Sequence, residues 1–249
     1  MISETHQKAR APRAFFGRRK GHALRPQQAE LFARLLPALS LDLAVSAPGD
    51  LSTLFPARVD TVRLEIGFGG GEHLIAQAQQ NPSIGFIGCE PFVNGVAKAL
   101  SAIDTHILTN IRLHHGDAIE LLAWLPPRSI SRIDLLYPDP WPKKRHWKRR
   151  LVQKDRIEEF ARILAPGSEF RFASDIEDYV AWTLSLMLRS GTFDWTAQRA
   201  DDWRLPWPDF VRTRYETKAL REGRTPCYLT FRRRRLEDGS SLAKPTPSL

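Results

Sequence analysis

The chain has 249 residues, of which 42% are hydrophobic and 26% charged, and this composition excludes a wholly disordered, collagen-like or fibrous protein. Lysine and arginine number 37 against 28 acidic residues, so the net charge of +9 favours a polyanionic partner, either nucleic acid or an anionic membrane surface. Only Cys89 and Cys227 are cysteines, which argues against a disulfide framework and a thiolate zinc site. Because no apolar run reaches the roughly 18–20 residues of a membrane helix, and residues 1–25 lack the apolar core of a secretory signal, we expect a cytoplasmic protein with no membrane or metal partner.

The chain divides into an arm, one domain and a tail. Residues 1–25 are rich in lysine and arginine and are predicted to form a flexible basic arm. Pro26 opens a predicted helix that runs to about Leu39, and a connector containing proline and glycine follows to residue 60. The helix and connector belong to a single predicted domain over residues 26–235, and residues 236–249 are expected to be disordered.

Short apolar runs alternate with segments of helical character from residue 62 onward. The runs are predicted strands and lie at Val62–Gly67, Ile84–Cys89, Ile111–His114, Ile133–Tyr137, Glu169–Ala173 and Cys227–Phe231. The segments between them are predicted helices and lie at His73–Gln79, Val93–Ile103 and Ile157–Leu164. Repeated strand-then-helix order predicts an α/β fold with a largely parallel sheet covered on both faces.

The first predicted strand ends in a glycine-rich turn that contains Gly67 and Gly69. Glycine permits positive φ and lets a ligand approach the backbone closely, although a plain turn without a ligand is the alternative. Glu90 closes the second strand, and a carboxylate about 20 residues after such a turn can accept hydrogen bonds from both ribose hydroxyls. The turn therefore predicts a nucleoside cofactor at the carboxyl end of the sheet.

Two cofactors compete for this turn. A dinucleotide places its pyrophosphate on a helix N-terminus after a G-x-G-x-x-G turn. Here Glu65 precedes the turn and Glu72 follows it, and two carboxylates suit a cationic ligand better than pyrophosphate. We therefore favour S-adenosylmethionine, which carries a sulfonium and no phosphate, and disfavour a nicotinamide dehydrogenase.

Two further carboxylates follow predicted strands. Asp117 is placed to accept a hydrogen bond from an adenine amino group or to cap the next helix, and both roles can hold. Asp139 lies in the segment Pro138-Asp139-Pro140-Trp141-Pro142, whose three prolines stiffen the chain. An aromatic face beside a carboxylate suits an unstacked base, and the alternative is a rigid loop whose Trp141 packs on the core.

A basic run follows at once, from Lys143 to Arg150. Six of its eight residues are fixed cations and one is a tryptophan, a combination that neutralises phosphates and stacks on bases. A run of charges is often no more than a solvated face. Because this one adjoins the strand end where chemistry is expected, it favours RNA as the partner.

Together these motifs resemble bacterial tRNA (guanine-N7)-methyltransferases, a family of class I S-adenosylmethionine-dependent enzymes. The resemblance covers about residues 60–233 and is most specific in the Pro138–Trp141 element with the basic run; it also includes Ser174-Asp175 and Thr213-Arg214-Tyr215-Glu216. It implies a Rossmann-like, doubly wound, mostly parallel seven-stranded sheet with an antiparallel last strand.

The resemblance also implies roles for individual residues. The cofactor site would be lined by Glu65, Gly67, Gly69, Glu90, Asp117 and Asp139, and Asp139 would also be the catalytic residue. Contacts with the substrate RNA would come from Lys143, Asp175, Thr213, Arg214, Tyr215 and Glu216. The tRNA backbone would be bound by Arg145, His146, Trp147, Lys148, Arg149 and Arg150. The target would be the guanine at position 46 of the tRNA variable loop.

Guanine N7 has an in-plane lone pair and carries no proton, so its methylation needs alignment rather than a general base. Either Asp139 or Asp175 would stabilise the positive charge that develops on the guanine and select guanine over adenine. Two alternatives remain open. One is a methyltransferase that acts on another RNA or on a protein, and the other is a non-catalytic RNA-binding protein that has lost its cofactor.

Overall fold

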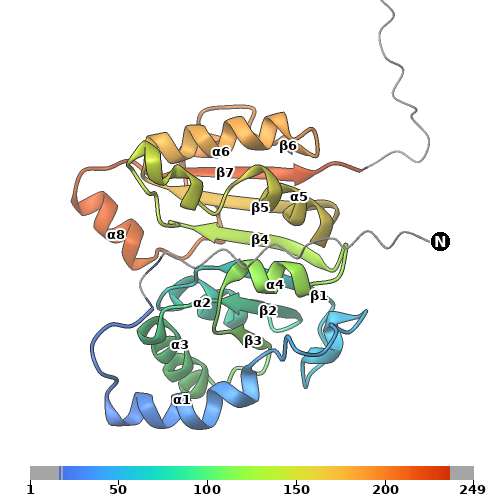
Figure 1. Cartoon of the computed structure of the whole chain (residues 1–249), viewed down its shortest axis with the longest axis vertical. Helices are drawn as coiled ribbons and strands as arrows, with labels where there is room; N and C mark the ends of the chain where they lie inside the picture. The colour runs from blue at the N-terminus through green and yellow to red at the C-terminus, as the bar shows by residue number, and fades with distance from the viewer. Residues whose placement is uncertain (1–16, 18, 236–249) are drawn as a thin grey trace, which may run out of the picture.

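The computed structural model describes residue 17 and residues 19–235 (Figure 1). The predicted tail at 236–249 and most of the predicted basic arm lie outside the described residues.

Seven strands form one sheet in the order β3-β2-β1-β4-β5-β7-β6. Their bounds are β1 Thr61–Ile66, β2 Ile84–Cys89, β3 Ile111–His114, β4 Ile130–Leu136, β5 Leu164–Ser174, β6 Phe193–Trp195 and β7 Cys227–Arg233. Strands β1 to β5 pair in parallel, and β7 lies antiparallel between β5 and β6. The predicted doubly wound, mostly parallel sheet with an antiparallel last strand is confirmed.

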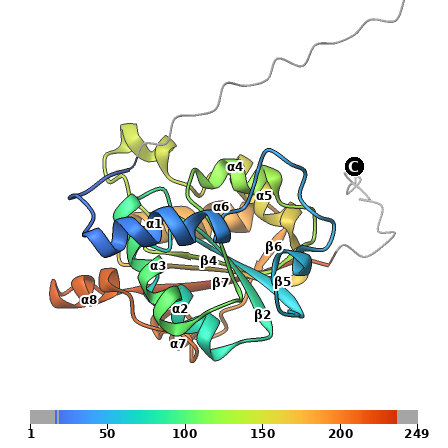
Figure 2. The ribbon, with the colours of Figure 1, turned by 90° about the horizontal axis from the view of Figure 1, so that it is seen from below.

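Helices cover both faces of the sheet. One face packs against α1 Pro26–Leu39, α2 Glu72–Gln80 and α3 Val93–His106, whose apolar side chains form one core cluster with β2 and β3. The other face packs against α4 Ala118–Trp124, α5 Lys154–Ile163 and α6 Glu177–Arg189 in a second and larger cluster. Figure 2 shows α2 and α4 on opposite sides of the strands. The remaining helical pieces are η1 Leu51–Leu54, η2 Lys144–Arg149, α7 Asp201–Arg204 and α8 Arg214–Arg221.

The sequence predicted the parallel strands better than the edge of the sheet. Strands β2 and β3 and helix α1 have the predicted bounds, whereas β5 begins at Leu164 rather than Glu169. The early part of β5 contains Pro166 and Gly167, which hide its alternation. Strand β6 was not predicted, because its three residues are too few to show a period and, within the described part of the chain, its one partner strand is β7.

Residues 19–22, which fall within the predicted basic arm, are hydrogen-bonded to the domain. The backbone nitrogen of Gly21 donates to Asn94 Oδ1 at 2.8 Å, Asn94 Nδ2 donates to the His22 carbonyl oxygen at 2.8 Å, and the Val93 nitrogen donates to the Arg19 carbonyl oxygen at 2.9 Å. These bonds dock residues 19–22 on the start of α3, which lies at the same end of the sheet as the glycine turn.

Strand order decides where a ligand binds. The chain places β2 and β3 on one side of β1 and β4 and β5 on the other, so the order reverses between β1 and β4. In such sheets, ligands bind outside the carboxyl ends of the strands at this reversal. The turns after β1, β2, β3 and β4 therefore converge on one place.

Candidate active site

A cavity of about 520 Å³ lies at the carboxyl ends of the strands and is hereafter the strand-end cavity. Its walls come from the glycine turn after β1, the segment after β2, the first turn of α4, the loop after β4, the basic run and the start of α8. Sites for drug-sized ligands measure roughly 300–1,000 Å³, so a nucleoside with an amino-acid side chain fits this volume.

The glycine turn is held between two helices. Gly69 has φ +57, in the left-handed region that favours glycine, and a Cβ there would lie 3.2 Å from the Tyr215 ring on α8. On the other side, a Cβ at Gly95 on α3 would lie 2.2 Å from the Gly69 carbonyl oxygen. The turn therefore depends on glycine both for its dihedral angles and for close approach.

Glu90 fixes the turn from the end of β2. Its Oε2 accepts a hydrogen bond from the Gly69 nitrogen at 2.7 Å, and its Oε1 accepts one from the Phe92 nitrogen at 2.9 Å. Burial raises the pKa of Glu90, while these bonds and the nearby Arg214 act in the opposite direction. Each carboxylate oxygen has a second lone pair, so Glu90 retains the capacity to accept from a ligand diol at the cavity wall.

Asp117 caps α4 and also lines the cavity. Its Oδ1 accepts from the Ile119 nitrogen at 3.0 Å, which confirms the predicted helix cap. Sequence reasoning missed two apolar neighbours on the same wall, Phe92 and Ile119. Each lies two residues after a strand-end carboxylate, Glu90 or Asp117. This spacing could have identified them in the sequence as apolar contacts for a planar ring of the ligand.

Glu65 is placed differently from the sequence-based expectation. It is 5% exposed, its Oε2 lies 2.8 Å from His73 Nδ1 on α2, and it is not among the residues that line the strand-end cavity. Side chains alternate along β1, so Glu65 faces α2 while its neighbour Ile66 lines the cavity. The acidic residue before the glycine turn therefore pairs with histidine instead of forming the wall.

The loop after β4 presents Asp139 to the cavity. Tyr137 and Trp141, on either side, both have left-handed backbone, with φ +49 and +44. Such conformations cost energy for bulky residues and are concentrated at functional sites. Asp139 is exposed at the cavity wall, and the protein around its carboxylate displaces water and raises its pKa.

The basic run divides into an exposed part and a buried end. Lys143, Lys144, Arg145 and Lys148 are exposed, whereas His146 and Arg149 are half-buried. The Arg149 guanidinium lies over the Trp141 ring at 4.9 Å from its centroid, and His146 meets the same ring edge-on. The alternative that Trp141 packs on the core is therefore wrong: the half-buried ring packs against the basic run and lines the cavity.

Arg150 is buried, unlike the exposed cations that the basic run predicted, and it is also among the residues that line the strand-end cavity. It is 2% exposed and stacks on Trp147 and Tyr179, with 4.6 and 4.8 Å to the ring centroids. Trp147 in turn packs edge-on against Trp182 on α6. A cation among aromatic rings is shielded from phosphates, so Arg150 holds the loop and Trp147 is mainly a packing residue.

Thr213 to Glu216 begin helix α8, but only two of the four side chains line the cavity. Thr213 is the N-cap, and its Oγ1 accepts from the Glu216 nitrogen at 3.2 Å. Glu216 is 2% exposed and accepts a hydrogen bond from the Tyr228 hydroxyl, so its expected contact with RNA is not what the structure shows. Arg214 and Tyr215 line the strand-end cavity.

Asp175, directly after β5, forms an ion pair with Arg224 and is not among the residues that line the strand-end cavity.

Within residues 17 and 19–235, no helix has the length and apolar character that a membrane span requires. In the same part of the chain, no group of three or more His, Cys, Asp or Glu side chains is arranged to hold a metal ion.

Residues 60–229 match the model of a family described as "Putative methyltransferase". The tRNA (guanine-N(7)-)-methyltransferase of Nitrobacter hamburgensis is 62% identical over 220 residues, which are 88% of this chain and 86% of that protein. The protein of the same name from Bradyrhizobium diazoefficiens is 61% identical over 221 residues, which are 89% of this chain and 94% of that one. This chain belongs to the tRNA (guanine-N7)-methyltransferase family. It is accordingly an enzyme of the methyltransferase class.

Solved structures confirm the fold of this family member. The 16S rRNA methyltransferase KamB superposes with a TM-score of 0.51 at 17% identity, covering 72% of this chain and 90% of that one. At this identity the likeness concerns the Rossmann-like methyltransferase fold alone.

Proposed function

We propose that the protein transfers a methyl group from S-adenosylmethionine to N7 of the guanine at position 46 in the variable loop of tRNA. The observation that carries this proposal is the convergence of Glu90, Asp117 and Asp139 on one cavity whose rim is the basic run. Relatives that share the family name match the chain over most of its length. A tRNA substrate would place the enzyme in the cytoplasm.

The residues around the strand-end cavity fit S-adenosylmethionine. Glu90 offers free lone pairs for the ribose hydroxyls, and Asp117 with Phe92 and Ile119 offers a polar and apolar wall for the adenine. Asp139 adds a negative charge to the same cavity, as a cationic ligand requires. When bound, S-adenosylmethionine supplies an electrophilic methyl group on a positively charged sulfonium.

Asp139 is better placed than Asp175 to act on the guanine. Asp175 is committed to Arg224, whereas Asp139 has no ion pair among the described residues and lines the cavity. Its carboxylate would accept hydrogen bonds from the N1 and amino edge of guanine and oppose the positive charge that the ring gains. Adenine lacks these donors, so the same contact selects guanine.

The exposed lysines and arginines of the basic run would hold the tRNA backbone. Lys143, Lys144, Arg145 and Lys148 are solvent-exposed and lie within ten residues of Asp139 in sequence. Because phosphates are read by charge and not by sequence, this surface would position the tRNA and leave base selection to the cavity.

Methylation of defined transcripts tests the proposal. Unmodified tRNA is incubated with the enzyme and labelled S-adenosylmethionine, and 7-methylguanosine is located by borohydride reduction and aniline cleavage. We expect one cleavage, at position 46, and no product from a transcript that carries adenine there. Product at another guanine, or only in ribosomal RNA, would favour the alternative RNA substrate. A failure to bind S-adenosylhomocysteine in isothermal titration would favour the non-catalytic alternative.

A further inference from the structure

A second group of charged residues lies outside the strand-end cavity and runs from the buried part of β4 to a half-exposed loop. Arg132 and Asp134 on β4, Arg171 on β5 and Asp209 from the loop between α7 and α8 form this group, hereafter the buried ionic cluster. Arg132 is 4% exposed and Asp134 3%, whereas the side chains of Arg171 and Asp209 are 15% and 37% exposed. The cluster faces α2, on the other side of the sheet from α4 and α5, because Arg132 Nη2 donates to Gln77 Oε1 at 2.8 Å.

Asp209 is the member that comes from outside the sheet. Its Oδ2 accepts from Arg132 Nη1 and its Oδ1 from Arg171 Nη1, each at 2.8 Å. Its backbone carbonyl oxygen accepts from Gln77 Nε2 at 2.6 Å. Two strands and one helix therefore hold a single loop residue, and the guanidinium groups keep the pKa of its carboxyl far below the usual range.

A cluster of this kind is a weak way to stabilise a core. Burying charges costs solvation free energy that their attraction only partly offsets, and apolar residues of the same size often serve as well. Charge-assisted hydrogen bonds are directional, however, and so fix the position of the group they hold. The arrangement is accordingly better suited to placing the loop than to stabilising the sheet.

Aromatic contacts seat the same loop. The Phe210 ring lies 5.5 Å from the His73 ring on α2 and 5.5 Å from the Tyr228 ring on β7. Trp207 donates its Nε1 hydrogen to Thr230 Oγ1 at 2.8 Å. The loop is thus fixed over a stretch of residues that ends shortly before α8.

The loop leads directly to the wall of the active site. Thr213, four residues after Asp209, caps α8, and the next two residues, Arg214 and Tyr215, line the strand-end cavity. Tyr215 packs so closely on the glycine turn that a Cβ at Gly69 would lie 3.2 Å from its ring. We propose that Asp209 is a positioning residue that, held by Arg132 and Arg171, fixes the α8 wall against the glycine turn and so sets the affinity for the methyl donor.

This inference rests on the proposed function only for its kinetic consequence. It is tested with Asp209→Asn, which keeps the shape of the side chain and removes its charge. The matched control is Asp194→Asn, because Asp194 forms a single ion pair with Arg234 on the exposed edge strand β6, with 58% of its side chain exposed. The measurements are hydrogen exchange over residues 207–216, the Kd of S-adenosylhomocysteine by titration, and KM and kcat with tRNA.

We expect Asp209→Asn to speed exchange in residues 207–216 and to raise the Kd of S-adenosylhomocysteine and the KM of the donor by about 10- to 100-fold, since small displacements of a site cost this much. At saturating donor, kcat should fall much less, and Asp194→Asn should match the wild type. Unchanged exchange and Kd would overturn the inference, as would faster exchange spread evenly over the sheet.

Phe210→Leu provides a second variant, because it loosens the same loop without touching the buried charges. If Asp209→Asn does not fold, the inference is tested with Phe210→Leu alone. A Kd of S-adenosylhomocysteine equal to that of the wild type would then overturn it. A wild-type enzyme that binds S-adenosylhomocysteine but methylates no tRNA would instead contradict the proposed function, and the exchange and binding results would still decide the role of Asp209.

Discussion

The guanidinium of Arg150 donates a hydrogen bond from Nε to the carbonyl oxygen of Pro140 at 2.8 Å. This bond joins the end of the basic run to the loop that carries Asp139. Arg150 Nη1 also donates to the Asp178 carbonyl oxygen on α6 at 3.3 Å, so the loop is tied to a helix as well. The end of the basic run, the loop that carries Asp139 and the start of α6 are therefore joined through one side chain.

Arg150→Ala should destabilise the protein. The substitution removes hydrogen bonds from a charged donor and the stacking on Trp147 and Tyr179, and we expect a loss of about 2–4 kcal/mol in the free energy of unfolding. Urea unfolding followed by circular dichroism measures this loss. Arg145→Ala is the control, since its side chain is exposed, and it should leave stability within about 0.5 kcal/mol of the wild type. Equal stability of the two variants would show that Arg150 is not a structural residue.

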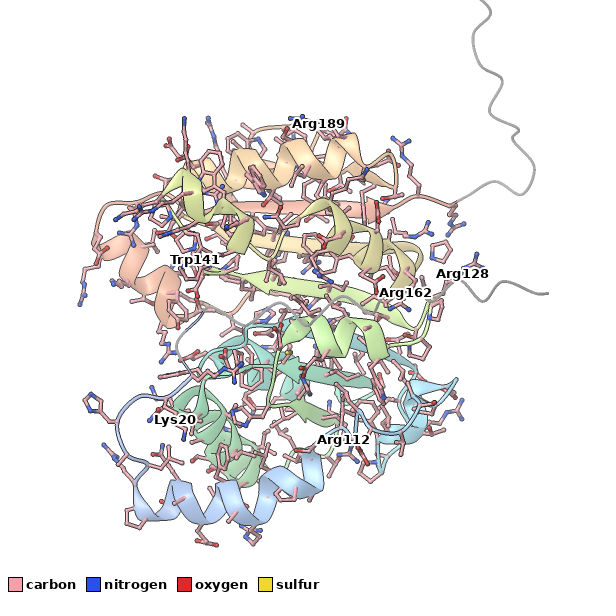
Figure 3. All side chains as sticks on the ribbon, viewed as in Figure 1. Lys20, Arg112, Arg128, Trp141, Arg162 and Arg189 are labelled. Atoms are coloured by element: carbon pink, nitrogen blue, oxygen red, sulfur yellow. The ribbon has the colours of Figure 1, made fainter. Side chains whose placement is uncertain are left out.

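Lys143→Ala combined with Arg145→Ala should weaken tRNA binding without slowing the chemistry. Removal of one phosphate contact reduces the slope of log K against log salt by roughly 0.7–0.9. We therefore expect a shallower salt dependence in filter binding and an unchanged kcat at saturating tRNA. Arg189→Ala serves as the control, because the exposed Arg189 ends α6 at the top of the view in Figure 3, apart from Trp141 at the left. A slope that Arg189→Ala changes as much would place the tRNA elsewhere.

The protonation state of the Asp139 carboxylate should determine how the reaction depends on pH. The pKa of Asp139 is raised by its loss of water, so the group becomes an anion at a higher pH than an ordinary aspartate. The proposed role of Asp139 requires the anion, so kcat/KM should rise with pH through this pKa and then level off. Asp139→Asn should lower kcat by about 10²- to 10³-fold, as loss of an electrostatic contact in an active site typically does, and should abolish the acidic limb. Retention of the limb in this variant would assign it to another group.

Two glycines separate the effect of backbone strain from that of contact. Gly69 and Gly191 both have positive φ, at +57 and +69, but a Cβ at Gly69 meets Tyr215 whereas a Cβ at Gly191 meets nothing within 4 Å. Replacement of either by alanine should cost about 1–2 kcal/mol in the free energy of unfolding, from the left-handed backbone. Only Gly69→Ala should also weaken binding of S-adenosylhomocysteine, which titration measures. Weakened binding in Gly191→Ala would mean that strain alone is responsible.

Much of the site could be predicted because it follows from local order along the chain. In a parallel sheet every strand ends at the same edge, so residues that end strands or follow them converge wherever the strand order reverses. Gly69, Glu90, Asp117 and Asp139 meet this condition, and all four line the strand-end cavity. Their sequence signal is a short apolar run followed by glycine or a carboxylate, and it needs no knowledge of distant partners.

Whether other charged residues are exposed or paired depends on partners that are distant in the sequence. Asp209 pairs with Arg132 across 77 positions, and Glu216 bonds to Tyr228 on β7. The basic run could not predict that Arg150 stacks on aromatic rings, because two of these rings, Tyr179 and Trp182, belong to α6. Pattern and composition report that a residue is charged, but not whether another element neutralises or covers it.

The amino-acid pattern was therefore sufficient to predict the parallel strands, the edge where the strand-end cavity lies and most of the carboxylates at that edge, because these follow from alternation of strand and helix; it did not predict α4, α6 or β6. Only packing between distant segments determined which charges face solvent and which are paired inside, such as Glu65 with His73. Burial and pairing arise only when folding brings distant surfaces together. Charged residues of the same type therefore form either an exposed basic surface or an internal ion pair, according to what packs against them.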